Sequence, residues 1–501
     1  MNAERTTGKQ EGALLGLILA LALALRLFKA DAALWYDEIF TVVNFVRLPV
    51  ADLIASFDSL NNHMLYSLLA KACAALLGEN PLALRLPAIL FGVGSIFIQW
   101  RIARRVMSPM AALGVALLLA ISYHHVWFSQ NARGYTGLLF FTSWATLLFV
   151  KGLERPEWKT WTGYALLVAA AMYTHMSAGF FFIAHGAVYL LMLTRRWPRA
   201  AQRRPGATTL LPIYGIALSI IVTLLLYAPI IGQAVRTIGE VSSASQAVAT
   251  TSTLAEWRSP LRALREIGAS ISAAGPLVPF ILIGAVLVLG AGIAALYRRA
   301  PVLTAIYVLH VPLATILLYL VGVRIWPRYF FVDIGFIMMA LVEGVIVWSA
   351  LVTGWLGLDR RWAGAGRALA VAGVALMALV SVGLLARNYA YPKQDYIAAR
   401  DHVLRNAAPQ DRISSVGLAA YAYGHYYAPQ FASVETGAEL ERLRARTPGA
   451  TWLLMSFPHQ LLSARPDVAA ELDRHFDKVA TFPGTLGDGA VWVYRSRGGG
   501  G

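Results

Sequence analysis

The sequence predicts a mostly α-helical, polytopic membrane protein of about eleven transmembrane helices, followed by a small C-terminal α/β domain. Only 14% of its 501 residues are charged, whereas soluble domains average about 25%. Hydrophobic residues make up 58% of the chain and are gathered in long runs. The C-terminal segment 387–501 lacks such runs and has the composition of a soluble domain.

The apolar runs define the expected membrane helices. A helix needs about 20 apolar residues to cross a bilayer, and each run approaches or exceeds that length. The pair 160–176 and 178–194 is the weakest candidate for two full spans. The runs cover residues 11–29, 85–103, 109–128, 134–151, 160–176, 178–194, 208–230, 276–297, 301–322, 328–350 and 368–386.

Basic clusters set the expected orientation. They follow the second, fourth, sixth, eighth and tenth runs and so fall on one side of the membrane, which predicts a cytoplasmic N-terminus. The net charge of +16 is spread over these clusters and does not indicate nucleic-acid binding. The clusters are Arg101, Arg104 and Arg105; Lys151, Arg155 and Lys159; Arg195, Arg196, Arg199, Arg203 and Arg204; Arg298 and Arg299; and Arg360, Arg361 and Arg367.

Three larger pieces fall on the opposite, extracytoplasmic side: a first outer loop at 30–84, a second at 231–275, and the C-terminal segment. We therefore divide the chain into a transmembrane domain, 1–386, and an extracytoplasmic α/β domain, 387–501. Within the first loop, 49–57 and 63–78 are amphipathic, and the second of these is expected to lie at the membrane interface.

The second outer loop combines a polar half, predicted to be mobile, with a basic amphipathic segment. We favour an interfacial helix whose arginines touch lipid head groups, and the alternative is a lid over a lipid-phosphate site. The apolar face is formed by Leu254, Trp257, Leu261, Leu264 and Ile267, with Arg258, Arg262 and Arg265 beside it.

The C-terminal domain is predicted to alternate helices and strands. It has no Gly-rich phosphate loop, which argues against a nucleotide-binding domain. Helices are expected at 396–406, 418–427 and 459–476, and strands at 412–417, 450–457, 478–482 and 490–495.

The unusual polar residues converge on the outer membrane face. Asp37 and Glu38 follow the first run directly, and ionised carboxylates near lipid are costly unless they are needed. Taken alone, this acidic pair could equally be a solvated loop. A transporter more often places its polar site near the bilayer midplane, so the one-sided gathering favours an enzyme. The same side receives Asn61, His63, Arg85, His124, His125, Arg133, Tyr135, Arg328 and Tyr329.

Carboxylates and arginines at an outer face suit chemistry on a lipid-linked phosphate. Arginine binds phosphate in a bidentate manner and stabilises the charge that develops on a phosphate leaving group. Asp37 could accept the proton of an attacking hydroxyl. We expect an enzyme that transfers a group from a lipid-linked phosphate to a hydroxyl acceptor. The alternatives are a flippase or transporter for a lipid-linked sugar, or a glycan polymerase or ligase.

Several short motifs resemble the GT-C glycosyltransferases, and in particular the branch of protein O-mannosyltransferases and bacterial ArnT-like (family 39) enzymes. The resemblance runs along nearly the whole chain, although an H-P-P-L-like segment has lost both prolines and an acidic position is occupied by Asn131. The matching stretches are Leu34-Trp35-Tyr36-Asp37-Glu38, Asn62-His63-Met64-Leu65-Tyr66, Arg85-Leu86-Pro87, Ser129-Gln130-Asn131-Ala132-Arg133-Gly134-Tyr135, Arg328-Tyr329 and Pro392-Lys393-Gln394-Asp395-Tyr396.

The resemblance implies a GT-C fold in the bacterial cytoplasmic membrane and an active site on the periplasmic side. The donor would be a polyprenyl-phosphate sugar and the acceptor a lipid, glycan or protein, with inversion at the sugar. Asp37 would be the general base, and Glu38 would support it or bind sugar. Arg133 and Arg328 would hold the phosphate with Tyr329. The cleft would be lined by Tyr36, His63, Tyr66, Arg85, Tyr135, His124 and His125.

Some of these residues have simpler interpretations. Arg85 could anchor its helix at the lipid head groups. His124 and His125 could be interfacial side chains or, as a less favoured alternative, metal ligands, because ligands usually need a spaced partner set. We therefore expect no cofactor, with a divalent metal as the alternative that is not favoured. Asp333 could neutralise Arg328, and Glu343 is expected to be a structural ion-pair partner.

Overall fold

The computed structural model describes residues 2–194, 210–247, 275–276, 278–321 and 325–497. The basic cluster at 195–204 and the amphipathic segment at 254–267 lie outside the described residues. Part of the second outer loop is a helix, because Ile231–Ala247 is helical where the sequence suggested that mobile residues begin.

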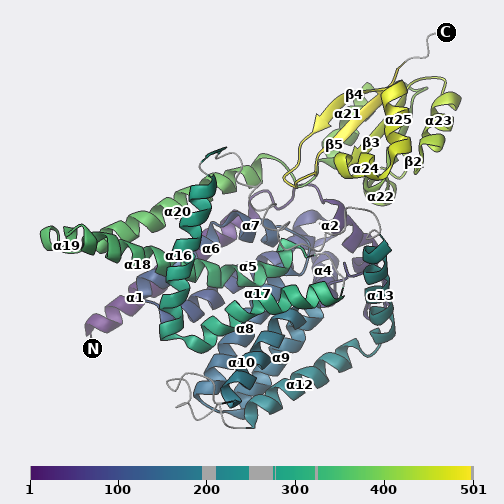
Figure 1. Ribbon diagram of the computed structural model, residues 1–501. Helices are drawn as coiled ribbons and strands as arrows, with labels where there is room; N and C mark the ends of the chain where they lie inside the picture. Colours follow the sequence, from purple (N-terminus) through teal and green to yellow (C-terminus); the bar gives the residue numbers. More distant parts are fainter. Residues whose placement is uncertain (1, 195–209, 248–274, 277, 322–324, 498–501) are drawn as a thin grey trace. The chain divides into compact units, whose positions relative to one another are not determined.

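Helices dominate the first 390 residues (Figure 1). Each of the eleven predicted runs coincides with one of them or with a bent pair. In chain order the helices are α1 (Asn2–Leu27), α2 (Tyr36–Thr41), the π-helix η1 (Val42–Val46), α3 (Val50–Ala55), α4 (Met64–Leu77), α5 (Pro81–Val106), α6 (Pro109–Ala120), α7 (Tyr123–Ser129), α8 (Tyr135–Glu154), α9 (Trp158–Thr174), α10 (Ala178–Leu193), α12 (Leu211–Tyr227), α13 (Ile231–Ala247), α16 (Val278–Arg299), α17 (Pro301–Val321), the 3₁₀ helix η5 (Pro327–Asp333), α18 (Ile334–Trp355), α19 (Leu358–Arg361) and α20 (Ala365–Ala390).

This is a multi-pass membrane protein. Within the described residues, seven helices are long and apolar enough to cross a bilayer, and the number rises to nine if the bent pairs α6–α7 and α12–α13 each form one span. The bends measure 57° and 88°. The two runs with the weakest prediction, α9 and α10, have 17 and 16 residues and fall short of the 18-residue length.

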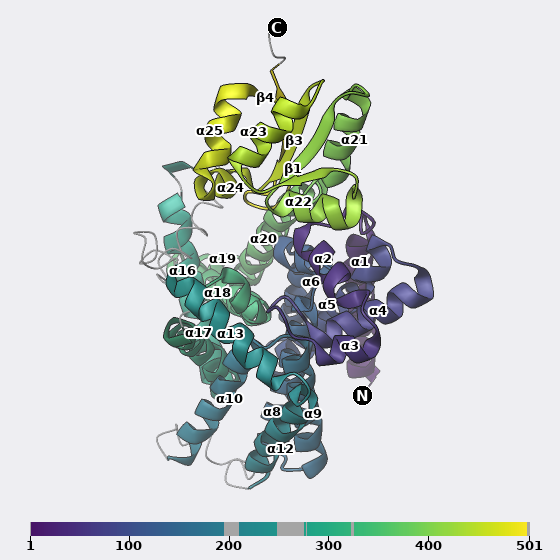
Figure 2. The ribbon, with the colours of Figure 1, turned by 90° about the vertical axis from the view of Figure 1, so that its right-hand side faces the viewer.

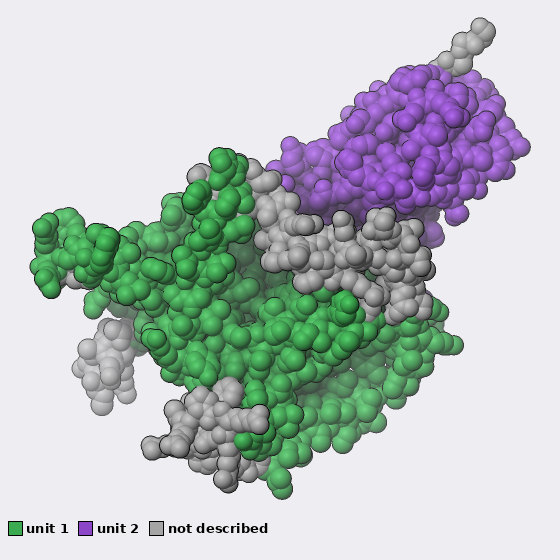
Figure 3. All heavy atoms as spheres, viewed as in Figure 1, with its two compact units in different colours: residues 1–28, 50–69, 86–382 green, residues 29–49, 70–85, 383–501 purple. Residues whose placement is uncertain are grey.

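The chain forms two compact units, which Figure 3 colours separately. Unit 1 comprises residues 1–28, 50–69 and 86–382, and unit 2 comprises 29–49, 70–85 and 383–501. Two segments of the first outer loop therefore pack with the C-terminal residues. The division at residue 386 that the sequence suggested stays a prediction.

Helices α16 and α18 make a close contact in unit 1, and both views show them side by side (Figures 1 and 2). Small residues allow membrane helices to approach through their backbones. A Cβ on Gly292 would lie 1.8 Å from the Ala340 carbonyl oxygen, and one on Gly344 would lie 2.0 Å from the Val288 carbonyl oxygen. Only glycine fits at these two positions.

Unit 2 contains a five-stranded mixed sheet with strand order β2-β1-β3-β5-β4. Strand β1 pairs in parallel with β2 and β3, whereas β5 pairs antiparallel with β3 and β4. The strands are β1 (Arg412–Val416), β2 (Ala432–Val434), β3 (Thr451–Ser456), β4 (Phe476–Phe482) and β5 (Val491–Ser496). The helices are α21 (Tyr396–Asn406), α22 (Leu418–Ala422), the π-helix η6 (Tyr423–Tyr427), α23 (Gly437–Arg446), α24 (Pro458–Ala464) and α25 (Pro466–His475).

Helices cover both faces of this sheet, with α21 on one side and α23 and α25 on the other (Figure 2). The central strand β3 is therefore buried along its whole length. Leu453 and Met455 pack with Leu440 of α23 and with Val468 and Leu472 of α25. This three-layer arrangement is the α/β domain that the sequence predicts.

The four predicted strands and the helix at 396–406 are confirmed. The prediction missed β2 and α23, which have only 3 and 10 residues. The single helix expected at 459–476 is wrong, because α24 ends before Arg465 and Pro466 begins α25. Proline restricts the residue before it to extended conformations and so breaks the helix.

Gly344→Ala is expected to lower the thermal unfolding temperature of the purified protein, because its Cβ would collide with the backbone of α16. Gly354→Ala in the same helix is the matched control, since a Cβ there meets nothing within 4 Å. Equal melting temperatures for the two variants, measured by intrinsic fluorescence, would contradict the close contact.

Candidate active site

Asp37 and Glu38 lie in the first turn of α2 and have different environments. The Glu38 side chain is fully buried, and its Oε2 accepts the Trp35 backbone N–H at 3.2 Å, which satisfies a donor at the helix start. The neighbouring Asp37 is only partly buried. The two adjacent carboxylates thus differ in access to solvent, with Asp37 the more accessible one.

Glu38 forms a bidentate ion pair with Arg85, at 2.8 Å from Nε to Oε1 and 2.6 Å from Nη2 to Oε2. Both side chains are buried, at 0% and 2% exposure. Breaking a buried pair leaves an uncompensated charge and costs about 3–5 kcal/mol. The pair therefore fixes the start of α2 strongly.

Arg85 also holds the segment that leads into α2. Its Nη1 donates to the Ala30 and Ala32 carbonyls at 2.9 and 2.7 Å, and its Nη2 donates to the Ala33 carbonyl at 3.0 Å. Together with the two bonds to Glu38, these contacts use all five N–H donors of the guanidinium. Arg85 is therefore an internal clamp of unit 2, in contrast to the head-group anchor that the sequence also allowed.

The C-terminal part of unit 2 contributes further contacts to the same stretch. The Gln394 side-chain oxygen accepts the Tyr36 backbone N–H at 2.9 Å, and the Tyr427 hydroxyl donates to the Leu34 carbonyl at 3.0 Å. Helix α22 packs on α2, where Tyr421 contacts the ring of Tyr36. Burial, with the charge of Asp37 next and then Tyr421, raises the pKa of Tyr36 to about 12.

Lys393 is a buried cation in this unit. The sequence comparison placed it in the matching stretch 392–396 but assigned it no role. Burial lowers the pKa of its ammonium to about 7, while Glu38 raises it and Arg85 lowers it further. Lys393 thus belongs to the same charge cluster as Glu38 and Arg85. A lone lysine in a loop carries no sequence signal, since only the fold buries it.

A second group of predicted residues gathers in unit 1 around His63. The Gly134 backbone N–H donates to His63 Nδ1 at 2.7 Å, and a Cβ on Gly134 would meet that nitrogen at 2.9 Å and the Thr174 carbonyl at 3.0 Å. Glycine therefore allows this contact. Arg133 Nη2 donates to Asn61 Oδ1 at 3.0 Å and lies 3.2 Å from His63 Nε2.

The environment of His63 favours the neutral form of its imidazole. Burial, followed by the positive charge of Arg133 and then by His175 and Arg328, holds its pKa well below the ordinary value. Because Nδ1 accepts from Gly134, the ring proton belongs on Nε2. Two donors, this N–H and the Arg133 guanidinium, therefore meet at one point, an arrangement suited to an anionic oxygen.

Aromatic rings surround Arg133. The guanidinium lies 5.7 Å from the centre of the Tyr135 ring, and His63 and His175 stack edge to face at 4.5 Å. Arg328, which packs on Trp326 at 4.8 Å, also acts on His63 through its charge. Both predicted phosphate-binding arginines therefore act on the same imidazole in unit 1, together with His175.

The other predicted residues lie elsewhere in unit 1. His125 is buried, with Nδ1 2.7 Å from Arg26 Nη2 and Nε2 2.9 Å from Ser95 Oγ, so both ring nitrogens are used inside the helix bundle. His124 is exposed and Tyr66 is fully buried in α4. Tyr329 is partly buried in η5. Arg26 was detectable as a charge within the first apolar run.

Two ion-pair expectations have clear outcomes. Glu343 pairs with Arg299 at 2.6 Å, as expected for a structural partner. Asp333 contacts His310 Nδ1 at 2.9 Å, so the idea that it neutralises Arg328 is not supported by its contacts. In the parts of the chain that the structure describes, no group of three or more His, Cys, Asp or Glu residues could hold a metal ion.

The fold is that of known membrane glycosyltransferases. The apo crystal structure of ArnT from Cupriavidus metallidurans matches with a TM-score of 0.52 and 14% identity, over 97% of this chain and 98% of that one. The oligosaccharyltransferase AglB from Archaeoglobus fulgidus, in complex with an inhibitory peptide and a dolichol-phosphate, matches with a TM-score of 0.53 and 12% identity, over 94% and 72%. The chain therefore shares the fold of these membrane glycosyltransferases.

A sequence family gives a narrower match. Residues 62–227 match the family described as dolichyl-phosphate-mannose-protein mannosyltransferase. The matched region includes His63, Arg85 and Arg133 but begins after Asp37 and Glu38. No curated protein matches the sequence. The structural similarity extends to both ArnT and AglB and does not distinguish between them.

Glu38→Gln is expected to destabilise the protein by about 3–5 kcal/mol, because Arg85 would lose its buried counter-charge. Glu79→Gln is the matched control: Glu79 forms a similar bidentate pair with Arg47 in the same unit, but that pair is exposed and such pairs contribute about 0–1 kcal/mol. Denaturant unfolding in detergent measures both. Equal losses would contradict the clamp.

Acidification is expected to destabilise unit 1 through His63. Its folded-state pKa is depressed, so the unfolded chain binds the proton more readily, and stability present above about pH 6.5 is lost as the pH falls below it. His63→Gln should flatten the fall in melting temperature between pH 7.5 and 5, whereas the exposed His425→Gln should not. Identical slopes in wild type and His63→Gln would refute this assignment.

Proposed function

We propose that this chain is an inverting glycosyltransferase that moves one sugar from a polyprenyl-phosphate carrier to an acceptor hydroxyl outside the cytoplasmic membrane. The observation that carries the proposal is the difference between the two carboxylates of α2. Glu38 is buried and held by Arg85, while Asp37 is only partly buried, on the helix turn that this pair fixes. An oriented, accessible carboxylate is what a general base requires.

In the proposed reaction Asp37 takes the proton of the acceptor hydroxyl as its oxygen attacks the anomeric carbon. The bond from that carbon to the phosphate oxygen breaks, and the polyprenyl phosphate leaves with the bonding electrons. A single displacement inverts the anomeric configuration. Glu38 acts as a positioning residue for α2, because its carboxylate is occupied by Arg85 and Trp35.

Arg133 and Arg328 are proposed to bind the carrier phosphate. The convergence of the Arg133 guanidinium with the His63 Nε2 donor supports this role, and charge-assisted bonds to phosphate are strong. The AglB match supports a polyprenyl-type carrier, since that structure is a complex with a dolichol-phosphate. Its inhibitory peptide is one example of the acceptor classes, which here are a lipid, a glycan or a protein.

The proposed orientation places the N-terminus in the cytoplasm of a bacterium and the site on the periplasmic side. The basic clusters at alternate loops support it. This orientation gives access to lipid-linked donors and none to cytoplasmic nucleotide sugars, which suits a polyprenyl-phosphate donor.

Asp37→Asn is expected to lower the rate of sugar transfer from a short-chain polyprenyl-phosphate sugar at least 100-fold, because general-base catalysis contributes about 10²–10⁴. Donor binding should stay within about twofold of wild type. Asp31→Asn, an exposed acid of the same loop, is the control and should transfer normally. Full activity of Asp37→Asn would eliminate the base assignment, and carrier movement across the bilayer without transfer would favour a flippase.

A further inference from the structure

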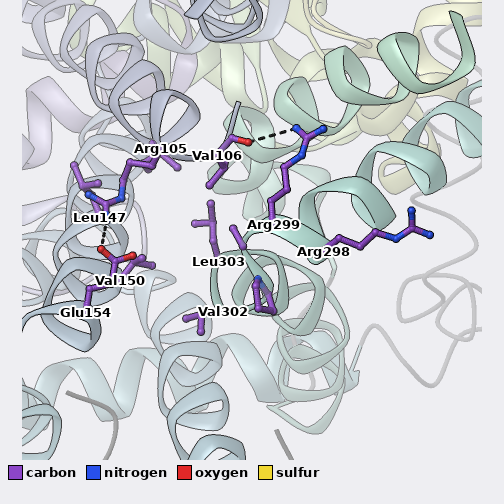
Figure 4. Close-up of a pocket in the computed structure, with 12 residues that line it drawn as sticks. Arg105, Val106, Leu147, Val150, Glu154, Arg298, Arg299, Val302 and Leu303 are labelled. Atoms are coloured by element: carbon purple, nitrogen blue, oxygen red, sulfur yellow. Dashed lines mark hydrogen bonds and ion pairs between the residues drawn. The ribbon is translucent and has the colours of Figure 1, made fainter. Parts of the chain in front are cut away.

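Unit 1 has a pocket at the ends of several helices, remote from His63 and Arg133. It has a volume of about 420 Å³ and lies where α5, α8 and α16 end and α17 begins (Figure 4). The 20-residue helix α8 separates it from Tyr135, a rise of roughly 28 Å. The lining residues are Ile102, Arg105, Val106, Leu147, Val150, Glu154, Arg298, Arg299, Ala300, Pro301, Val302 and Leu303.

The charge of this pocket is positive. Three arginines and one glutamate line it. Arg105 pairs with Glu154, and Arg299 pairs with Glu343 and donates to the Val106 carbonyl at 3.4 Å. Among the described residues Arg298 forms no ion pair, and its side chain leaves α16 in a different direction from Arg299 (Figure 4). The guanidinium of Arg298 thus supplies uncompensated charge.

Two further features favour an anion. Helix α17 starts at Pro301 in the wall of the pocket, and the N-terminus of a long helix carries partial positive charge. The apolar side chains of Ile102, Leu147 and Leu303 provide a hydrocarbon surface beside the arginines. A phosphate with an attached acyl chain would satisfy both parts of this lining.

We propose that this pocket binds the phosphate head group of an anionic phospholipid. Basic pockets between membrane helices are typical sites for such head groups. A simpler role for these arginines, as partners of helix C-termini at the membrane surface, explains their charge but not a cavity with a mixed apolar and basic lining. In the predicted orientation the pocket faces the cytoplasmic leaflet.

The glycine contact between α16 and α18 supports the pocket. Gly292 and Gly344 allow the two backbones to touch, and the Arg299–Glu343 pair lies at the same helix interface. The position of the C-terminal end of α16 is therefore fixed by packing as well as by charge. The contact between α16 and α18 therefore holds the part of α16 that contributes Arg298 and Arg299 to the pocket lining.

The test compares Arg298→Glu with Arg360→Glu. Both arginines are exposed, and Arg360 belongs to a basic cluster on the same predicted side without lining the pocket. Full-length protein is titrated with phosphatidylglycerol, and bound lipid is counted by native mass spectrometry. We expect Arg298→Glu to weaken binding about fivefold or more, which is the effect of about one arginine charge at a membrane surface, and Arg360→Glu to leave it unchanged.

Equal lipid binding by the two variants would overturn the proposal, as would equal binding of phosphatidylcholine and phosphatidylglycerol by the wild type. Displacement of the lipid by millimolar glycerol phosphate alone would overturn the choice of a lipid over a free phosphate. Leu303→Trp, which fills the pocket without changing charge, is a second variant and should also weaken binding. Matching melting temperatures show that all variants are folded.

Discussion

The buried ion pair between Glu38 and Arg85 is the constraint on which the geometry of α2 depends. A guanidinium removed from water needs partners for five N–H groups, and Arg85 finds two on Glu38 and three on the carbonyls of residues 30–33. This requirement sets both the path of the chain into α2 and the orientation of its first turn. Asp37 lies on the same turn, so its position depends on the ion pair between Glu38 and Arg85.

The C-terminal residues of unit 2 reinforce this arrangement. Gln394 and Tyr427 bond to the backbone at Tyr36 and Leu34, and the buried ammonium of Lys393 adds a charge to the cluster. The α/β part of the chain therefore has a role beyond its own core. It contributes to holding the acidic stretch from which the proposed base projects.

Unit 1 contains a cluster of positive charge around His63. Burial, together with the charges of Arg133 and Arg328, holds the pKa of His63 well below its ordinary value, so the positive charge at this site comes from the two arginines. An anion is the natural complement to such a cluster.

Much of the fold followed from the sequence. Apolar runs located the membrane helices because the length of an apolar run is a strong local signal. At 459–476 the apolar periodicity predicted a single helix, but Pro466 divides it into α24 and α25. The GT-C fold followed from the ordered motifs. The site was predicted less completely. Arg85 was selected, but its clamp of five bonds arises from contacts 47 to 55 residues apart.

Lys393 and His175 show why the remainder could not be predicted. Each is an ordinary polar residue beside a helix end, and its burial next to distant charges depends on tertiary packing. His125 shows the reverse. Its place in an outer polar turn suggested a cleft residue, whereas it is buried in the helix bundle in contact with Arg26.

The most direct test of this account is hydrogen–deuterium exchange of the peptide spanning residues 30–41 in wild type and Arg85→Lys. Lysine keeps the charge but offers three donors in place of five. We predict faster exchange in this peptide, with unchanged exchange in the α8 helix of unit 1. Equal protection of residues 30–41 in the two proteins would contradict the claim that the Arg85 clamp orders this stretch.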